Sequence, residues 1–323
     1  MEAINWTNRA YNSFTKVTIV TIYVLILLGG IVRSTGSGLG CPDWPRCFGT
    51  WVPPTSESQL PADYKVRYGA HLSPANATFN AVKTWIEYVN RLAGVLTGLF
   101  IAATTLLAFA AFGLSLPFWL SFAGMVLTGA QGFLGAKVVS TSLAPTIISL
   151  HMLLAQLIVL LLVAGYWIAK GYRLSKLANR RGLWLVGIFA SIALQIYMGI
   201  HVRQQVDNGI NHLQMTKEAV VLGFDWVFYI HRSFSLIVVL AIAAEASKYI
   251  KLTLNVFDPA KVLWIGTMVV VLAETIFGAL LFYLELPAFG QPVHLLLGSM
   301  LLGLVFSLFF TSYARMAPES EIA

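Results

Sequence analysis

Long stretches without a charged residue dominate the hydrophobic pattern of the chain. Such stretches cover residues 17–32, 92–136, 138–169, 182–202 and 286–314. A helix needs only about 20 mostly apolar residues to cross the hydrocarbon core of a bilayer. The pattern therefore predicts a polytopic membrane protein.

The stretch 92–136 is too long for one helix. Gly113 and Pro117 interrupt it near its middle, which predicts a helical hairpin of two spans. Six further spans are expected near residues 15–33, 146–168, 183–203, 226–247, 261–284 and 291–315. The expected fold is all-α, with eight transmembrane helices and therefore both termini on the same side of the membrane.

Composition and charge agree with this assignment. The 323 residues are 58% hydrophobic and 11% charged, whereas roughly a quarter of residues are charged in soluble domains. Basic residues gather in two joints between spans, which the positive-inside rule places in the cytoplasm together with both termini. They are Lys170, Arg173, Lys176, Arg180 and Arg181 in one joint, and Lys248, Lys251 and Lys261 in the other. The net charge of +7 thus needs no nucleic acid to explain it.

The long first loop, residues 34–83, is then expected to face outward. It contains the only two cysteines, Cys41 and Cys47, and an oxidising compartment would favour a disulfide between them. Two free thiols are the alternative, and a metal site with only two thiol ligands is the weaker one. Only about 15 polar residues precede the first span, and no small-residue cleavage site follows it, so we expect a retained anchor.

An internal repeat relates the two halves of the sequence. The segment from Glu87 to Arg91 aligns with the segment from Phe228 to Arg232, and His151 and His294 follow at nearly equal spacing. The segment 30–33 is more loosely similar to the segment 200–203. We therefore expect two repeated four-helix bundles, residues 1–170 and 171–323, with equivalent sites on the same, outer side of the membrane.

The aligned positions carry the candidate chemistry. His231 and His294 lie near the outer ends of their spans, and Asn90 and His151 lie at matching depth in the other half. Ionisable residues inside a membrane usually mark a site, and histidines on facing helices can hold a haem iron. Two imidazoles would saturate an iron for electron transfer, whereas His151 opposite Asn90 would leave one position open. A histidine bonded only to a neighbouring helix is the alternative for each.

A carboxylate is present in one half only. Glu87 shares a helix face with Asn90, and its repeat counterpart is the apolar Phe228. Glu87 is thus a candidate for proton transfer beside a reactive iron, or else a residue bonded at the membrane surface. Arg91 directly follows Asn90, and Arg232 directly follows His231. Each arginine would pair with a haem propionate or extend to the membrane interface.

Two further polar residues lie within predicted spans. Glu274 is in the seventh span, and the repeat places Gln131 opposite it in the third. Both are interpreted first as hydrogen-bonding residues between helices. His71, His201 and His212 fall in or beside outward loops without a clear repeat counterpart, and no site is assigned to them.

The segment from Gly29 to Cys47, followed by Trp-Val-Pro-Pro at 51–54, resembles the first span and loop of the haem A synthase family. The eight-helix plan in two bundles extends the resemblance over nearly the whole chain. It implies an enzyme that oxidises the C8 methyl group of haem O to the formyl group of haem A, by two hydroxylations and loss of water. The N-terminal bundle would bind haem O as substrate, and the C-terminal bundle would bind a haem B cofactor.

The resemblance also implies roles for single residues. His231 and His294 look like the axial ligands of haem B, His151 like an axial ligand of the substrate haem, and Glu87 like the acid beside it. Cys41 and Cys47 look like the family's pair of outer-loop cysteines. Asn90 departs from the family pattern, which has a histidine there. Either catalysis uses an iron with an exchangeable position, or the chain has lost the activity; the persistence of Glu87, His151 and the loop motif favours the first.

The implied setting is the cytoplasmic membrane of a bacterium. Expected partners are haem O, the lipid bilayer, a haem O synthase, a membrane electron donor such as quinol, and a second copy of the chain. One alternative is a b-type cytochrome or haem-delivery protein without catalysis. Another is a transporter with histidine proton relays, which the absence of paired broken helices in the sequence pattern disfavours.

Overall fold

The computed structural model describes residues 2–69, 78–172, 180–252 and 257–312. Within these ranges the chain forms helices and loops, without a β-strand. Eight of the described helices are long and apolar enough to cross a membrane. The predicted all-α fold class with eight transmembrane helices is confirmed. The basic residues Arg173 and Lys176 of the predicted cytoplasmic joint lie outside the described residues.

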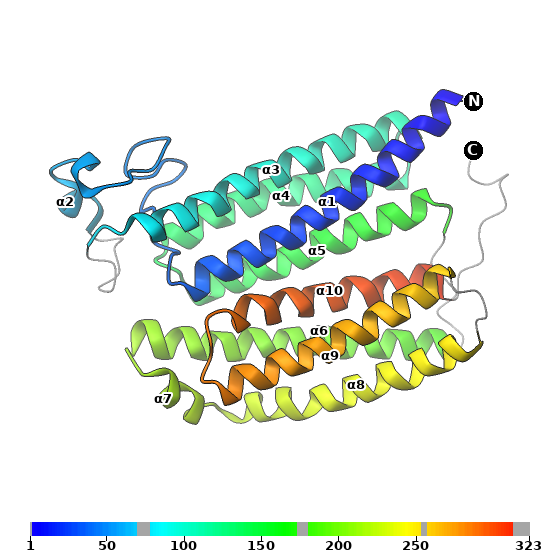
Figure 1. The fold of residues 1–323 in the computed structure, drawn as a ribbon. Coiled ribbons are helices and arrows are strands. Elements are labelled where there is room, and N and C mark those ends of the chain that lie inside the picture. Colours follow the sequence, from blue (N-terminus) through cyan, green and yellow to red (C-terminus); the bar gives the residue numbers. More distant parts are fainter. Residues whose placement is uncertain (1, 70–77, 173–179, 253–256, 313–323) are drawn as a thin grey trace. The chain divides into compact units, whose positions relative to one another are not determined.

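The long helices match the predicted spans (Figure 1). They are α1 (Glu2–Ser34), α3 (Ala81–Phe112), α4 (Leu116–Ser140), α5 (Pro145–Ala169), α6 (Arg180–Asp207), α8 (Trp226–Leu252), α9 (Pro259–Tyr283) and α10 (Gly290–Thr311). The predicted hairpin break is also present, because α3 ends at Phe112 and α4 begins at Leu116. Gly113 takes a positive φ of 60° in this turn, a conformation that favours glycine.

Capping residues set where the site-bearing helices begin. The Asn80 side chain accepts a hydrogen bond from the Lys83 N–H at 3.1 Å and starts α3. Asp258 accepts one from the Lys261 N–H at 2.9 Å, and Pro259 opens α9 behind it. Residues at the helix start thus determine where α3 and α9 begin.

Two short helices lie in the loops. They are α2 (Tyr64–Tyr68), in the long first loop, and α7 (Lys217–Leu222), between α6 and α8. Figure 1 shows α2 and its flanking segments beyond the end of α1 and the start of α3. We call this end of the N-terminal helices the loop end.

The contacts divide the chain into two compact units. One consists of Met1–Leu114 and Ser121–Val159, and the other of Ser115–Leu120 and Leu160–Ala323. The first contains α1 to α3, most of α4 and the first part of α5, whereas the second contains α6 to α10. The division between the units falls inside α5. The predicted halves, residues 1–170 and 171–323, remain a prediction.

In the first unit, hydroxyl groups connect the helices. The Thr18 and Thr104 hydroxyls join α1 to α3 at 2.8 Å, and the Tyr11 and Ser121 hydroxyls join α1 to α4 at 3.3 Å. Hydrophobic burial does not drive helices together in lipid, because the acyl chains are equally apolar. These buried hydrogen bonds and close side-chain packing therefore hold this part of the unit.

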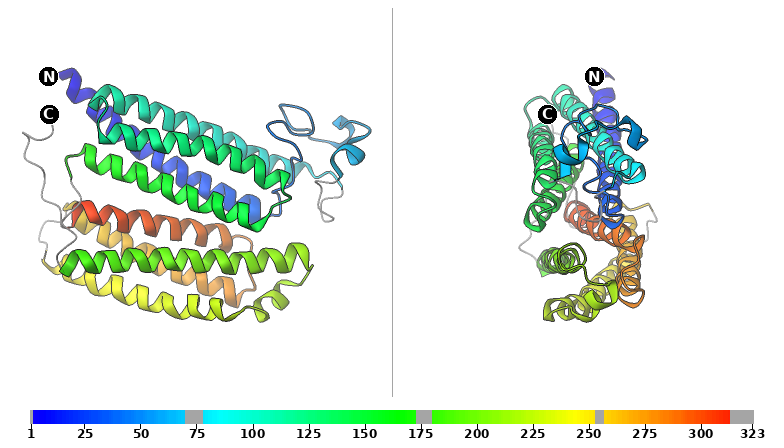
Figure 2. Two further views of the ribbon diagram at one scale, coloured as in Figure 1. Left: turned by 180° about the vertical axis from the view of Figure 1, so that it is seen from behind. Right: turned by 90° about the vertical axis from the view of Figure 1, so that its left-hand side faces the viewer.

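In the second unit, four helices close into a ring. Helix α6 packs against α8 and α10, and α9 packs against the same two helices. The long helices of this unit run beside one another in Figure 2. Helices α8 and α10 therefore lie diagonally across the ring, and side chains from both can point to its centre.

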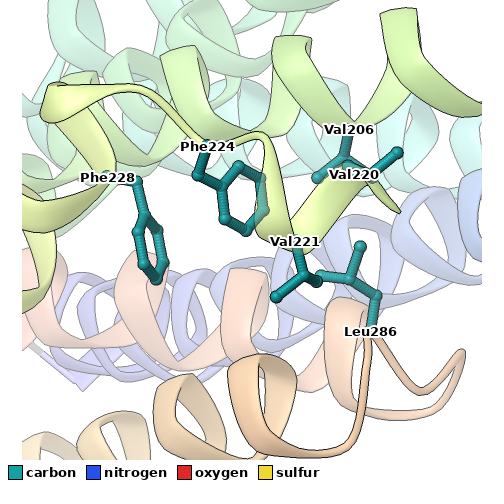
Figure 3. Packing of buried hydrophobic residues seen from close by; sticks show 6 residues of the cluster. All are labelled: Val206, Val220, Val221, Phe224, Phe228 and Leu286. Atoms are coloured by element: carbon teal, nitrogen blue, oxygen red, sulfur yellow. The ribbon is translucent and has the colours of Figure 1, made fainter. Parts of the chain in front are cut away.

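Apolar side chains around α7 form a cap at one end of this ring (Figure 3). We call them the α7 cap: Val206, Val220, Val221, Phe224, Phe228 and Leu286. The Phe228 ring stacks on Phe224 at 4.5 Å and on Phe282 at 5.2 Å between ring centroids. The cap thus packs α7 against the end of α6, the start of α8 and the loop after α9.

Candidate functional site

Glu87 lies within about two turns of the start of α3 and is only 4% exposed. Its Oε2 accepts a hydrogen bond from the Cys41 N–H at 2.9 Å. Its Oε1 accepts a hydrogen bond from Nη2 of Arg91 at 2.6 Å, one helical turn further on. The candidate acid is thus held between an arginine of its own helix and the backbone of the first loop.

The loop that contacts Glu87 is closed by a disulfide. The structure contains the expected bond between Cys41 and Cys47, and both cysteines are fully buried. Aromatic residues cover the bond; they are Phe48, Tyr64, Tyr68, Phe79 and Tyr88. We call residues 41–47 the disulfide loop.

Arg91 bonds to the disulfide loop as well as to Glu87. Nη1 donates to the carbonyl oxygens of Asp43 at 2.7 Å and Arg46 at 2.9 Å, and Nη2 donates to that of Cys41 at 2.9 Å. The sequence pattern suggested a haem propionate or the membrane interface for this guanidinium. In the structure its partners are the loop and Glu87, a role that the pattern did not indicate.

His151 and Asn90 contribute buried polar atoms to the same unit. Oδ1 of Asn90 and Nδ1 of His151 have no hydrogen-bond partner among the described residues. Gln131 donates from Nε2 to the His151 carbonyl oxygen at 2.9 Å, so it connects α4 to α5 as predicted. Among the described residues, no side-chain hydrogen bond or ion pair joins Asn90 or His151 to Glu87.

His231 and His294 lie on α8 and α10, the diagonal helices of the second unit. Each imidazole faces a glycine of a neighbouring helix. A Cβ on Gly199 of α6 would stand 3.4 Å from Cε1 of His231, and one on Gly278 of α9 would stand 3.2 Å from Cε1 of His294. Both rings therefore occupy space that larger residues would fill.

Polar side chains also hold these two histidines. Gln195 donates from Nε2 to the His231 carbonyl oxygen at 3.0 Å, as Gln131 does for His151. Oε2 of Glu274 lies 3.1 Å from Nδ1 of His294. The two atoms form an ion pair between α9 and α10 only when the imidazole is protonated, and the predicted interhelical hydrogen bond of Glu274 is not among the hydrogen bonds of the described residues.

The donor set suits a haem iron better than a bare metal ion. The described residues contain no group of three or more histidine, cysteine, aspartate and glutamate side chains that would hold such an ion. An iron in a porphyrin needs only one or two axial ligands from the protein. His231 and His294, with glycines beside their rings, fit that need, and His151 with its unpartnered Nδ1 fits a single axial ligand.

Arg232 has different partners from Arg91. Its guanidinium carbon lies 5.9 Å from the ring centroid of Phe228, 5.6 Å from that of Tyr229 and 5.6 Å from that of Phe282. The side chain is exposed. A guanidinium resting on aromatic faces keeps its donors available to an anionic group.

The sequence pattern did not single out several of these residues. Gly199, Gly278 and Gln195 were missed, although equal spacing separates Gly135 from His151 and Gly278 from His294. A Cβ on Gly135 would also lie near His151, 3.9 Å from Cε1. The repeat that revealed the histidines therefore also indicated Gly135 and Gly278.

A further ion pair lies beside the α7 cap. Nε2 of His201 is 2.9 Å from Oδ2 of Asp225, the residue before α8. Burial raises the pKa of Asp225, but hydrogen bonds, of which that from His201 is the largest, outweigh it and hold the pKa below its ordinary value.

Comparison with known proteins identifies the family. The family described as cytochrome oxidase assembly protein (COX15-CtaA) matches residues 12–306. A protein of Geobacillus kaustophilus named Heme A synthase is 23% identical over 96% of this chain and 94% of its own length. The chain belongs to the haem A synthase family.

Other family members match shorter or similar stretches. Heme A synthase of Shewanella oneidensis is 28% identical over 57% of this chain, and the match spans 54% of that protein's length. Heme A synthase of Geobacillus thermodenitrificans is 23% identical over 92% of this chain and 90% of its own. All candidate residues, from Cys41 to His294, lie within the stretch that matches the family.

Proposed function

We propose that this membrane protein is a haem A synthase. It oxidises the C8 methyl group of haem O to a formyl group by two successive hydroxylations and loss of water, and so supplies a cofactor of cytochrome oxidase. The observation that carries the proposal is Glu87, a buried carboxylate fixed by Arg91 and the disulfide loop in a chain of this family. A buried, oriented carboxylate is suited to hold and release a proton beside a reacting group.

The first unit binds haem O as substrate. His151 is the axial ligand, and its ring stands at a glycine of α4 that leaves room beside it. Asn90 replaces the second imidazole, and an amide is a poor ligand for iron. This unit would therefore offer the haem iron a single imidazole, and Glu87 is three residues from Asn90 on the same helix face.

The second unit binds haem B. His231 and His294 hold it from opposite helices of the ring, and the bound group supplies one-electron transfer. Gln195 and Glu274 orient the two histidines, and Arg232 pairs with a propionate through donors that its aromatic neighbours leave free. The apolar α7 cap packs at the same end of the ring and includes Phe228, about one turn before His231.

We further propose that the protein spans the cytoplasmic membrane of a bacterium, with the disulfide loop outside and both termini in the cytoplasm. A membrane electron donor such as quinol reduces it, a haem O synthase delivers the substrate, and the chain associates with a second copy. Eight apolar helices and an external disulfide support this placement.

Extracted haems test the proposed reaction. The protein is expressed with a haem O source, its haems are extracted, and chromatography with mass detection separates them. We expect haem A or its hydroxylated precursor beside haem B, and neither oxidised product in the Glu87→Ala variant. Unchanged haem O in the wild type, with haem B bound, would contradict the proposal.

A non-catalytic b-type cytochrome or haem-delivery protein is the second candidate. Asn90 favours it, because the resemblance to the family implies a histidine at this position and an amide is a poor ligand for iron. This candidate predicts haem B alone and haem O untouched, which is the contradicting outcome above. Replacement of Asn90 by histidine would then restore bis-imidazole ligation without restoring turnover.

A further inference from the structure

The guanidinium of Arg91 joins two parts of the first unit. Three of its four acceptors are backbone carbonyls of the disulfide loop, and the fourth is the carboxylate of Glu87 on α3. The Arg91 side chain is only 13% exposed and that of Glu87 6%. A buried guanidinium whose fork is satisfied by fixed acceptors has little freedom to turn elsewhere.

The rest of the docking surface lies on the same face of α3. The Thr84 hydroxyl donates to the Gly40 carbonyl oxygen at 2.8 Å, and the Glu87 carboxylate accepts from the Cys41 N–H. Thr84, Glu87 and Arg91 are three and four residues apart, so they form one stripe on the helix. The disulfide loop is therefore seated on α3 through the residue that we assign as the acid.

We propose that Arg91 is a positioning residue that couples the disulfide loop to Glu87. Loop carbonyls fix the guanidinium, and the guanidinium fixes the carboxylate. Removal of Arg91 therefore loosens the disulfide loop, and opening of the disulfide frees Glu87. The coupling goes beyond the proposed function and rests on it only where Glu87 is given a proton-transfer role.

The predicted repeat offers an internal comparison. Arg232, the aligned arginine, contacts aromatic rings, and Phe228 occupies the place of Glu87. The described residues of the second unit contain no disulfide. The coupling is thus specific to the unit that carries the carboxylate.

The rate of disulfide reduction measures the coupling without any haem chemistry. Purified full-length protein is treated with dithiothreitol, which is oxidised to its cyclic disulfide while the Cys41–Cys47 bond becomes two thiols. Alkylation and mass spectrometry then count the thiols over time. We expect the Arg91→Gln variant to be reduced at least about tenfold faster than the wild type, because three hydrogen bonds that hold the loop are lost.

Three more variants define the cause. Arg91→Lys keeps the charge but not the planar fork, so its rate should lie between those of Arg91→Gln and the wild type. Glu87→Gln should also be reduced faster. Arg67→Gln removes an exposed arginine of α2 in the same long loop and should keep the wild-type rate. Haem B absorbance and size-exclusion profiles report folding for each variant.

A double variant tests whether Glu87 and Arg91 act as one network. Each single substitution increases the reduction rate by some factor. If the two residues act as one network, the double variant Glu87→Gln/Arg91→Gln will show a rate increase markedly smaller than the product of the two single factors. A wild-type reduction rate in Arg91→Gln, or single effects that multiply exactly, would overturn the proposal.

Turnover separates this proposal from the proposed function. In Arg91→Gln we expect kcat to fall while KM for haem O stays near the wild-type value, and Arg91→Lys to recover part of kcat. A raised KM with an unchanged reduction rate would place Arg91 on the substrate instead and overturn the coupling. Faster reduction in Arg91→Gln, with no haem A from any variant or the wild type, would uphold the coupling and refute the synthase.

Discussion

At the scale of residues, one substitution between the aligned segments changes the use of an arginine. Arg91 and Arg232 each have a contact with the residue four positions earlier, which is Glu87 in one segment and Phe228 in the other. A carboxylate draws the guanidinium into a buried ion pair, whereas a phenyl ring lets it lie flat and keep its donors free. The residue four positions before the arginine therefore decides whether the protein itself binds the guanidinium or leaves it available to a ligand.

Gly40 is a second residue on which the disulfide loop depends. A Cβ at this position would stand 2.6 Å from the Lys83 carbonyl oxygen and 2.8 Å from the Thr84 nitrogen, so only glycine permits this approach to α3. We expect Gly40→Ala to lower the thermal unfolding temperature, since overpacking typically costs about 1–3 kcal/mol. Gly69→Ala is the matched control, because a Cβ on Gly69 would meet no atom of the described residues within 4 Å. Equal unfolding temperatures for the two variants would refute the close docking.

Asp225 gives the protein a defined acid sensitivity. Its pKa is held below the ordinary value of 3.8, chiefly by the hydrogen bond from His201 against the opposing effect of burial. A lowered pKa in the folded state means that the ionised group stabilises the fold above its ordinary pKa and that this stabilisation disappears as pH falls through the native pKa. In thermal unfolding from pH 6 to pH 3, we expect the wild type to lose more stability below about pH 4 than Asp225→Asn. Parallel curves would show that the pair with His201 contributes nothing.

At the scale of elements, glycines decide how closely helices pass the candidate ligands. Gly199 and Gly278 lie where α6 and α9 meet the rings of His231 and His294. Elsewhere on the same helices, a Cβ on Gly187 or Gly266 would stand more than 4 Å from every other described side chain and loop. Helix packing in membranes uses small residues at close contacts, and here two of those contacts are imidazole rings.

Gly278 and Gly266 make a matched pair for a test of this role. A methyl group at Gly278 would stand 3.2 Å from Cε1 of His294, so the ring must move in Gly278→Ala. We expect this variant to bind less haem B and to show an altered Soret band, whereas Gly266→Ala should keep the wild-type spectrum. Identical spectra from both variants would mean that α9 does not position His294.

The elements themselves were predictable, and the contacts of the first loop were not. The stretches without charged residues located the spans, because a helix must be long and apolar to cross a bilayer. Gly113 and Pro117 located the break in the longest stretch, because glycine and proline interrupt helices. The repeat drew attention to Glu87 and the three histidines. For Arg91 the sequence suggested a haem propionate or the membrane interface, because no periodic pattern shows which carbonyl groups a loop of this kind presents to a helix.

At the scale of the whole molecule, the two units close their site-bearing ends by different chemistry. The first unit uses a disulfide loop bonded to charged residues of α3. The second uses the α7 cap, in which Phe224 and Phe228 stack, and Phe282 of α9 stacks on the other face of Phe228. The polar closure holds the Glu87 carboxylate, whereas the apolar closure buries phenyl rings. This division suits a reactive substrate site in one unit and an electron-transfer cofactor in the other.

Separate sites in separate units make a prediction about haem retention. His231→Ala or His294→Ala should remove haem B, because each deletes one of the two imidazoles that we propose hold it from opposite helices of a closed ring. His151→Ala and Glu87→Ala should abolish haem A formation and leave haem B bound, since neither residue belongs to that ring. The pyridine haemochrome spectrum gives the haem B content, and chromatography of extracted haems gives the product. Loss of haem B from His151→Ala would show that His151 holds the cofactor, and the assignment of substrate and cofactor to different units would then be wrong.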